Sequence, residues 1–285
     1  MTTPNFEQIT QQINMITVMH TQFKAAYEGI LQLVEQSIMS ALPLGGSVVA
    51  PTGSGKTHLI KSIERKFTQN TDLIDPSSAV VVISASSSPS SGSMIDRSLQ
   101  QLGHPPGIRS IKLQDLRQSL LMQAFQDRGV RLLIIDEFQH LFRGRRDIQA
   151  SEITDLLKEM MDVTGVPIFV FGTDELGDLA HLDEQFASRL PARFQIRPFA
   201  KGEEWKGFLQ AFHEQSEFIN ISSLSTLAKQ LHYASSGSPR TLKFLINAAV
   251  KEALVQGKLT VERCHYSEAF SAVFGPFGAL KNPFN

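Results

Sequence analysis

The sequence predicts an α/β fold in which a five-stranded parallel sheet carries helices on both faces, followed by a small all-helical domain. Two observations predict it. Strand-like and helix-like segments alternate up to Pro198, and only helical patterns follow that residue. The chain has 285 residues, 42% hydrophobic and 19% charged, which is enough for one large core and a smaller second domain.

Five short runs rich in apolar, β-branched or aromatic residues are the expected strands. They are residues 47–49, 79–84, 132–135, 168–171 and 194–197. Their near-continuous apolar character is typical of strands buried on both faces of a parallel sheet. The serine-rich run 84–93 after the second strand is expected to be a flexible loop.

Helical patterns precede, separate and follow these strands. Apolar residues recur with helical spacing in the segment that begins at Phe23, and again around 113–124 and 153–161. Candidate helices after the last strand are 203–217, 223–234, 240–256 and 261–274. The predicted organisation is an N-terminal helical segment packed on the core (1–42), an α/β core (43–198), a small helical domain, called the lid (199–274), and a tail (275–285). The tail keeps three phenylalanines, so it either docks on its own domain or binds a partner.

Charge and cysteine content limit the function classes. The formal net charge is -1 and the pI is about 6.7, so any nucleic-acid surface must be a local patch. The single cysteine, Cys264, cannot form an internal disulfide. The polar start is not a secretory signal, and the apolar runs are too short to span a membrane, so a cytoplasmic location is expected.

A phosphate-binding loop, or Walker A motif, follows the first expected strand. Its glycines allow successive backbone N–H groups to turn toward one anion, and the next helix adds its positive N-terminal end. Ala50 replaces the usual first glycine, which is tolerable because Pro51 pushes residue 50 toward extended geometry. This pattern predicts binding of a nucleoside triphosphate, with Lys56 on the β/γ-phosphates and the Thr57 hydroxyl on Mg²⁺. The expected nucleotide-binding residues are Thr52, Gly53, Ser54, Gly55, Lys56, Thr57, His58 and, from the lid, Arg240.

An acidic pair after the third expected strand has the character of a Walker B motif. The apolar run 132–135 leads directly into Asp136 and Glu137. At the carboxyl end of a strand beside the phosphate-binding loop, Asp136 can hold Mg²⁺ through water, and Glu137 can polarise the attacking water. The alternative is an acidic cap between a strand and a helix.

Four further residues are candidates for assisting hydrolysis. Thr173 follows the fourth strand and is placed to hydrogen-bond the attacking water, unless it only caps the next helix. Arg189 and Arg193 come just before the fifth expected strand, where a guanidinium can face the γ-phosphate of a neighbouring subunit; ordinary surface arginine is the alternative. Arg240 follows the helix-opening residues Gly237 and Pro239 and is able to reach back to the phosphates.

These elements, in this order, resemble the AAA+ ATPases over nearly the whole chain. Within that class, the runs 133–141 and 171–175 look like the TniB/TnsC transposition regulators of Tn7-like and CRISPR-associated transposons. The resemblance implies an ATP-dependent regulator that oligomerises on duplex DNA as a ring or filament. It also implies two protein partners, a transposase and a target-selection protein, sometimes of the TniQ type.

The resemblance places DNA contacts on loops and helix starts after the second strand. The candidates there are Ser93, Arg97, Arg109, Lys112 and Arg117, with a solvated helix face as the alternative for each. The basic cluster at 143–146 is a second candidate surface.

Two other functions are also compatible with the sequence. An ATPase of the origin-recognition or helicase-loader type shares every ATP motif, but commonly carries a separate winged-helix DNA reader, for which the chain is expected to be too short. A nucleotide-gated interaction module with little turnover is the third possibility, and the paired Asp136 and Glu137 argue against it.

Overall fold

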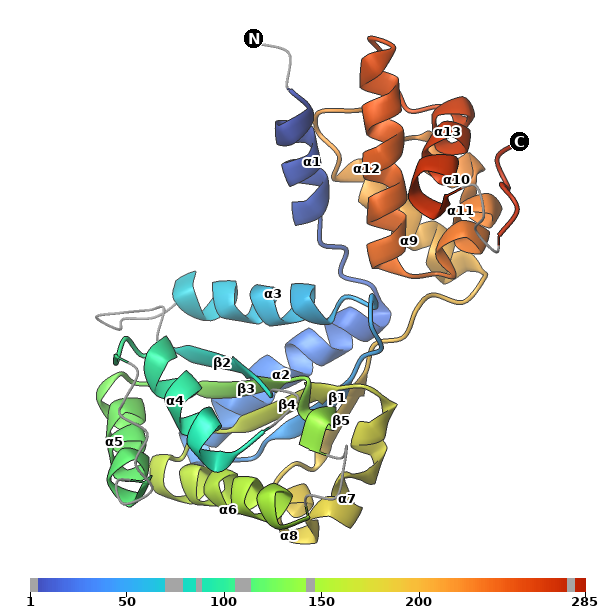
Figure 1. Cartoon of the computed structure of the whole chain (residues 1–285). Coiled ribbons are helices and arrows are strands. Elements are labelled where there is room, and N and C mark those ends of the chain that lie inside the picture. Colours follow the sequence, from blue (N-terminus) through green and yellow to red (C-terminus); the bar gives the residue numbers. More distant parts are fainter. Residues whose placement is uncertain (1–4, 70–78, 86–88, 106–113, 142–146, 276–279) are drawn as a thin grey trace. The chain divides into compact units, whose positions relative to one another are not determined.

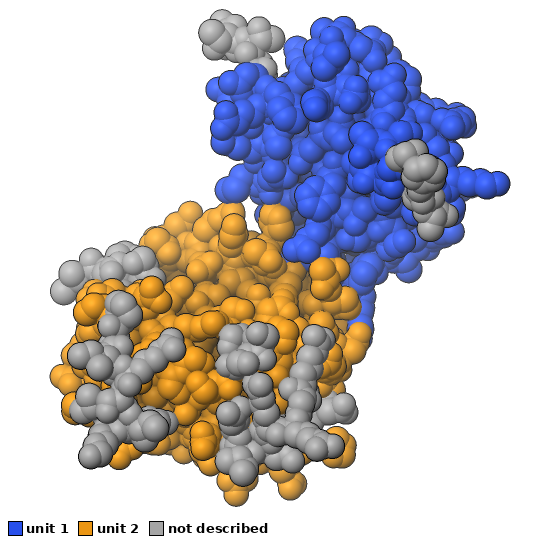
Figure 2. All heavy atoms as spheres, viewed as in Figure 1, with its two compact units in different colours: residues 1–21, 53–55, 197–285 blue, residues 22–52, 56–196 orange. Residues whose placement is uncertain are grey.

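The structure, a computed structural model, describes residues 5–69, 79–85, 89–105, 114–141, 147–275 and 280–285. It divides into two compact units, coloured separately in Figure 2. The α/β unit comprises Gln22–Thr52 and Lys56–Ile196, and the helical unit comprises Met1–Thr21, Gly53–Gly55 and Arg197–Asn285. Among the described helices, none is both long and apolar enough to cross a lipid bilayer.

A five-stranded parallel sheet forms the centre of the α/β unit, as predicted. Its strands are β1 (Gly46–Val49), β2 (Val80–Ser84), β3 (Leu132–Asp136), β4 (Ile168–Gly172) and β5 (Ala192–Gln195), in the order β2-β3-β4-β1-β5. The fifth strand begins two residues earlier than expected and ends at Gln195, because Ala192 pairs with Gly46 and Gln195 with Val49. Pairing with β1 therefore sets the limits of β5, and the apolar pattern of β5 itself does not.

Helices cover both faces of this sheet, so the unit has three layers (Figure 1). One face packs against α2 (Thr21–Ser40) and α3 (Lys56–Gln69), and the other against α4 (Ser91–Gln101), α5 (Gln114–Asp127) and α6 (Asp147–Thr164). Alternate strand residues enter the two cores: Leu133 and Ile135 lie in the second, Leu132 and Ile134 in the first. A run buried on both faces explains why β3 shows no polar alternation before Asp136, whereas β5 alternates half-buried with exposed residues.

Short elements connect the strands and helices at the ends of the sheet. They are η3 (Phe138–Leu141), η4 (Asp174–Asp178), α7 (Leu179–Leu182) and α8 (Glu184–Ser188). The serine-rich segment is only partly the expected loop, since Ser90 accepts a hydrogen bond from the Ser93 N–H and caps α4. Residues 86–88 of that run lie outside the described part of the chain.

The helical unit contains α9 (Glu203–Glu214), α10 (Ser223–Thr226), α11 (Ala228–Ser235), α12 (Pro239–Val255) and α13 (Arg263–Phe274). The helix expected at 223–234 is two helices, because the chain breaks at Leu227, where ψ is 15°. The last residues dock on this unit. Phe284 is buried and stacks on Tyr266, with 5.6 Å between ring centroids, and its carbonyl accepts a hydrogen bond from Arg263.

The expectation that all of residues 1–42 pack on the α/β core is wrong for the first helix. α1 (Phe6–Met15) belongs to the helical unit, where Ile9 and Ile13 are fully buried among the C-terminal helices. Lys243 of α12 fixes its end by donating hydrogen bonds to the carbonyls of Asn14 and Ile16 at 2.9 and 2.8 Å. Within the described part of residues 1–42, α2 is the helix that packs on the sheet.

Candidate active site

The loop after β1 has the backbone of a phosphate-binding loop. Gly53 and Gly55 have φ of +85° and +110°, a region that glycine enters without strain, and they flank the buried Ser54. Ala50 is fully buried, and its N–H donates to the Gly172 carbonyl at 2.8 Å, so the methyl group packs in the core. α3 begins at Lys56. The N–H groups of its first turn have no acceptor within the helix, and they therefore point toward the loop. Thr57 is exposed in the first turn of that helix, next to the half-buried His58.

Lys56 meets the acidic pair at the carboxyl end of β3. Its ammonium lies 2.8 Å from Oδ1 of Asp136 and also contacts a carboxylate oxygen of Glu137. The Asp136 oxygen accepts a second hydrogen bond from the Glu137 N–H at 2.8 Å. The two motifs, 80 residues apart in sequence, therefore converge as predicted.

Glu137 is held in an unusual conformation. Its φ of +55° is left-handed, which is rare for a side chain other than glycine, asparagine or aspartate. Burial raises the pKa of its carboxyl, but hydrogen bonds from Lys56 and Gln139, with the nearby charges of Lys56 and His140, outweigh burial and lower that pKa. The side chain therefore remains a carboxylate at neutral pH.

Thr173 lies beside this pair at the end of β4. Its hydroxyl oxygen is buried and has no hydrogen-bond partner among the described residues. Its N–H donates to the side-chain carbonyl of Gln139 at 3.4 Å. Thr173 stands before η4 without a side-chain capping bond, so the alternative role as a helix cap finds no support in the geometry.

Gln139 is the functional candidate that sequence reasoning missed. Its amide nitrogen donates to Glu137 Oε2 at 2.5 Å, and the side chain is only 3% exposed. The sequence feature that points to Gln139 is its place as a polar residue within the apolar segment that follows the acidic pair. Spacing alone gives no reason to separate it from the neighbouring His140.

The start of α12 contacts the loop through backbone atoms. The Gly53 carbonyl accepts hydrogen bonds from the Arg240 N–H and the Ser238 hydroxyl, both at 3.2 Å. Ser238 also caps α12, accepting from the Thr241 N–H, and Pro239 occupies the first turn. Arg240 itself is exposed.

Arg189 lies at the opposite end of the sheet. Its carbonyl accepts a hydrogen bond at 2.9 Å from the N–H of Gly45, which precedes β1, whereas the loop follows the other end of that strand. Its guanidinium forms an ion pair with Asp162 at 2.9 Å. Arg193 is exposed on β5 and pairs in register with Ser47.

Of the candidate DNA contacts, three lie in the described residues. Ser93 completes the capping box of α4, Arg97 donates to the Ser84 carbonyl, and Arg117 forms a largely buried ion pair with Asp96. Arg117 therefore already has an ion-pair partner within the protein, and its position in the helical sequence pattern did not indicate this. Arg109, Lys112 and the basic cluster at 143–146 lie outside the described residues.

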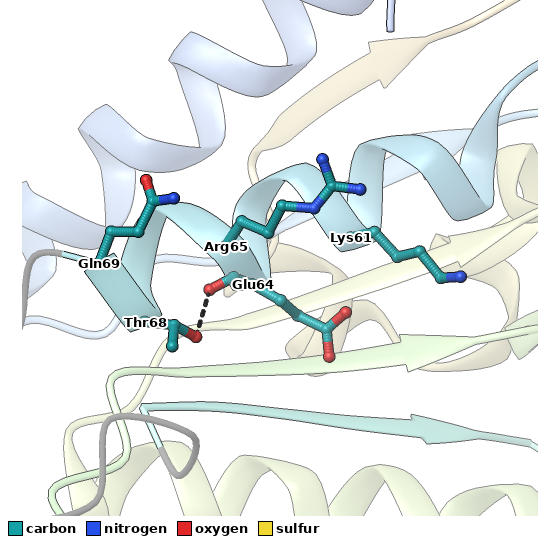
Figure 3. Close-up of a pocket in the computed structure, with 5 residues that line it drawn as sticks. All are labelled: Lys61, Glu64, Arg65, Thr68 and Gln69. Carbon is teal, nitrogen blue, oxygen red and sulfur yellow. Dashed lines mark hydrogen bonds between the residues drawn. The ribbon is translucent and has the colours of Figure 1, made fainter. Parts of the chain in front are cut away.

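Two other features are separate from this site. A surface hollow is lined by one side of α3 (Figure 3), and its first lining residue, Lys61, is more than a helical turn beyond Lys56. Glu262, Cys264 and His265 also have potential ligand atoms within 4.8 Å of one another. Both His265 ring nitrogens already make hydrogen bonds, to the Glu262 N–H and to Gln256, so that group does not fit a metal ion.

A parallel sheet in this order, with the loop lysine on two acids and a helical unit after the last strand, defines an AAA+ ATPase. The chain belongs to the TniB family: the family model described as "Bacterial TniB protein" matches residues 9–199. A search of curated proteins found no match.

Solved structures confirm the fold. The Aeropyrum pernix ORC2 protein (ADPNP-ADP complexes) has a TM-score of 0.66 at 17% identity, covering 87% of this chain and 67% of that one. The Aeropyrum pernix ORC1 protein in complex with DNA has a TM-score of 0.69 at 15% identity, covering 93% and 69%. Drosophila ORC bound to DNA gives 0.62 at 18% identity, covering 94% and 66%. The chain thus spans about two thirds of the length of each.

Proposed function

We propose that this ATPase is a transposition regulator that oligomerises on duplex DNA, hydrolyses ATP between subunits, and links a target-selection protein to a transposase. The observation that carries the ATP site is the convergence of Lys56 with Asp136 and Glu137. TniB membership supports the transposition role over the origin-recognition alternative, which shares the same ATP chemistry.

Residues of the site take distinct roles in this proposal. The loop N–H groups and Lys56 bind the phosphates, Glu137 accepts a proton from the attacking water, and Thr173 orients that water. Thr57 and Asp136 supply a hydroxyl and a carboxylate, oxygen donors that suit Mg²⁺. The ion, when bound, neutralises charge on the phosphates.

The position of Arg189 supports hydrolysis between subunits. It is fixed beside Gly45 at the amino end of β1, and the phosphate-binding loop starts beyond the carboxyl end of that strand. The four residues of β1 span roughly 13 Å. The guanidinium of Arg189 is therefore better placed to contact the nucleotide of a neighbouring subunit than the nucleotide of its own subunit. Arg193 is the second candidate for this role, since its side chain is exposed.

DNA binding rests on the family and on the residues after β2. Two DNA-bound neighbours, Aeropyrum ORC1 and Drosophila ORC, share the fold at low identity. In this chain, Arg97 and Ser93 are the described candidates for phosphate contacts, and Arg117 is the weaker one because Asp96 engages it. We place Arg109 and Lys112 among the candidates from the sequence alone.

The experiment that tests the proposal uses Glu137→Gln, which keeps the shape of the side chain and removes its basicity. We expect this variant to bind ATP and duplex DNA like the wild type while phosphate release falls about 100-fold or more. With ATP, Mg²⁺ and DNA, electron microscopy should then show stable rings or filaments. Full turnover in Glu137→Gln, or isolated monomers on the grids, would contradict the proposal.

A further inference from the structure

The side chain of Gln139 connects the ends of two strands. Its amide nitrogen donates to Glu137 after β3, and its amide oxygen accepts from the N–H of Thr173 after β4. Both ends of one buried amide are thus used, each toward a residue of the hydrolytic site. Any buried amide needs hydrogen-bond partners, so the informative point is that both partners of Gln139 belong to the hydrolytic site.

The backbone of β4 is shaped around this side chain. A Cβ at Gly172 would lie 2.5 Å from Oε1 of Gln139, so the amide rests directly on the strand where any larger residue would displace it. The carbonyl of the same Gly172 accepts the Ala50 N–H at the entrance of the phosphate-binding loop. Gln139 therefore contacts Thr173 directly and reaches the phosphate-binding loop through Gly172.

We propose that Gln139 is the positioning residue that holds the Glu137 carboxylate against Thr173 during hydrolysis. This inference rests on the proposed role of Glu137 as the base. The Glu137 carboxylate contacts two donors, Lys56 and Gln139. Lys56 serves the phosphates in the proposed mechanism, and a cation shared with ATP holds a carboxylate less firmly. Gln139 has no such second task.

A purely structural role for Gln139 predicts a different result from a positioning role. Loss of a structural hydrogen bond lowers stability and weakens ATP binding and turnover together. Loss of positioning lowers kcat and leaves the ATP affinity unchanged, because Gln139 acts through Glu137 and is not one of the residues assigned to binding ATP. The decisive readout is therefore the change in kcat compared with the change in ATP affinity.

Two substitutions separate the two ends of the amide. Gln139→Met keeps the length and volume of the side chain and removes both hydrogen bonds. Gln139→Glu keeps an acceptor for the Thr173 N–H but places a carboxylate against Glu137. The control is Gln118→Met on α5, which removes the same type of hydrogen bond, from Gln118 to Glu159 at 2.5 Å, from a surface pair.

We expect kcat to fall about tenfold or more in Gln139→Met and Gln139→Glu, with the ATP dissociation constant and KM within about twofold of the wild type. Gln118→Met should match the wild type. Wild-type kcat in either Gln139 variant, or an affinity loss as large as the rate loss, overturns the inference. If Gln139→Met does not fold, Gln139→Glu decides by the same criteria, and failure of both to fold assigns Gln139 a structural role. An inactive Glu137→Gln beside a fully active Gln139→Met would refute this inference alone, whereas an active Glu137→Gln refutes the proposed function.

Discussion

The ammonium of Lys56 lies 2.8 Å from Oδ1 of Asp136 and also contacts Glu137, so two acidic side chains share one cation. Lys56 is about nine-tenths buried in its side chain, which makes the arrangement less exposed to screening than a surface ion pair. ATP phosphates would compete for the same ammonium. Nucleotide binding and release of the acidic pair are therefore expected to be coupled.

Lys56→Ala should weaken ATP binding by about tenfold to 100-fold, the value of a charge-assisted hydrogen bond. It should also lower the thermal stability of the ligand-free protein, because Asp136 and Glu137 are left as an unbalanced pair of like charges. Titration with a fluorescent ATP analogue and a melting curve measure the two effects. Lys61→Ala, five residues along α3 on the exposed side, is the matched control and should change neither.

Ser238→Ala should destabilise the helical unit by about 1 kcal/mol, because Ser238 caps α12. It should also weaken ATP binding, since its hydroxyl donates to the Gly53 carbonyl and helps to shape the loop. Urea unfolding and the ATP titration check both results. Ser222→Ala removes a serine at the start of α10 that makes no side-chain capping bond, and is expected to leave ATP binding intact. Equal effects of the two substitutions on ATP affinity would argue against a role for Ser238 at the loop.

Asp183 should stabilise the segment before Arg189 in a pH-dependent way. Burial raises its pKa, but hydrogen bonds from Thr154, the Phe186 N–H and Lys158, with the Lys158 charge, outweigh burial and lower that pKa. The unfolded chain then binds more protons, so this stabilisation is present above about pH 4, the ordinary aspartate value, and is lost as pH falls through the folded value.

Asp183→Ala should therefore lower the free energy of unfolding by about 1 to 2 kcal/mol at neutral pH, through loss of the α8 cap and the Lys158 pair. The difference from the wild type should shrink as pH falls below about 4. Urea unfolding over a pH series measures it. Asp155→Ala removes the more exposed partner of Lys158 and should cost less. A difference that grows toward low pH would be inconsistent with a lowered pKa.

The sequence was sufficient to predict the elements whose signal is local. Four apolar runs and a glycine-rich loop correctly located the first four strands and the phosphate-binding loop before α3, since buried parallel strands and phosphate loops require those residues. The convergence of Lys56 on Asp136 and Glu137 followed from the rule that parallel strands meet at one edge.

Features set by tertiary contact could not be predicted in this way. β5 takes its limits from pairing with β1, so its weak pattern misplaced it by two residues. α1 packs with the helical unit through Ile9 and Ile13, two residues that give no indication of which partner buries them. Arg117 resembles a surface cation in sequence, yet Asp96 on the neighbouring helix engages it. The role of Gln139 depends on its contacts with Glu137 and Thr173, and these contacts are visible only in the folded structure.

The most direct test of hydrolysis between subunits is to mix two inactive variants on duplex DNA. Glu137→Gln keeps its arginines and lacks the base, while a variant with both Arg189→Ala and Arg193→Ala keeps the base and lacks the arginines. Each should bind ATP and show little turnover alone. An equal mixture should regain about a quarter of the wild-type rate, because one in four random neighbour pairs joins an intact Glu137 to intact arginines. No recovery in a mixture shown to co-assemble, or full activity of the double arginine variant alone, would contradict the account.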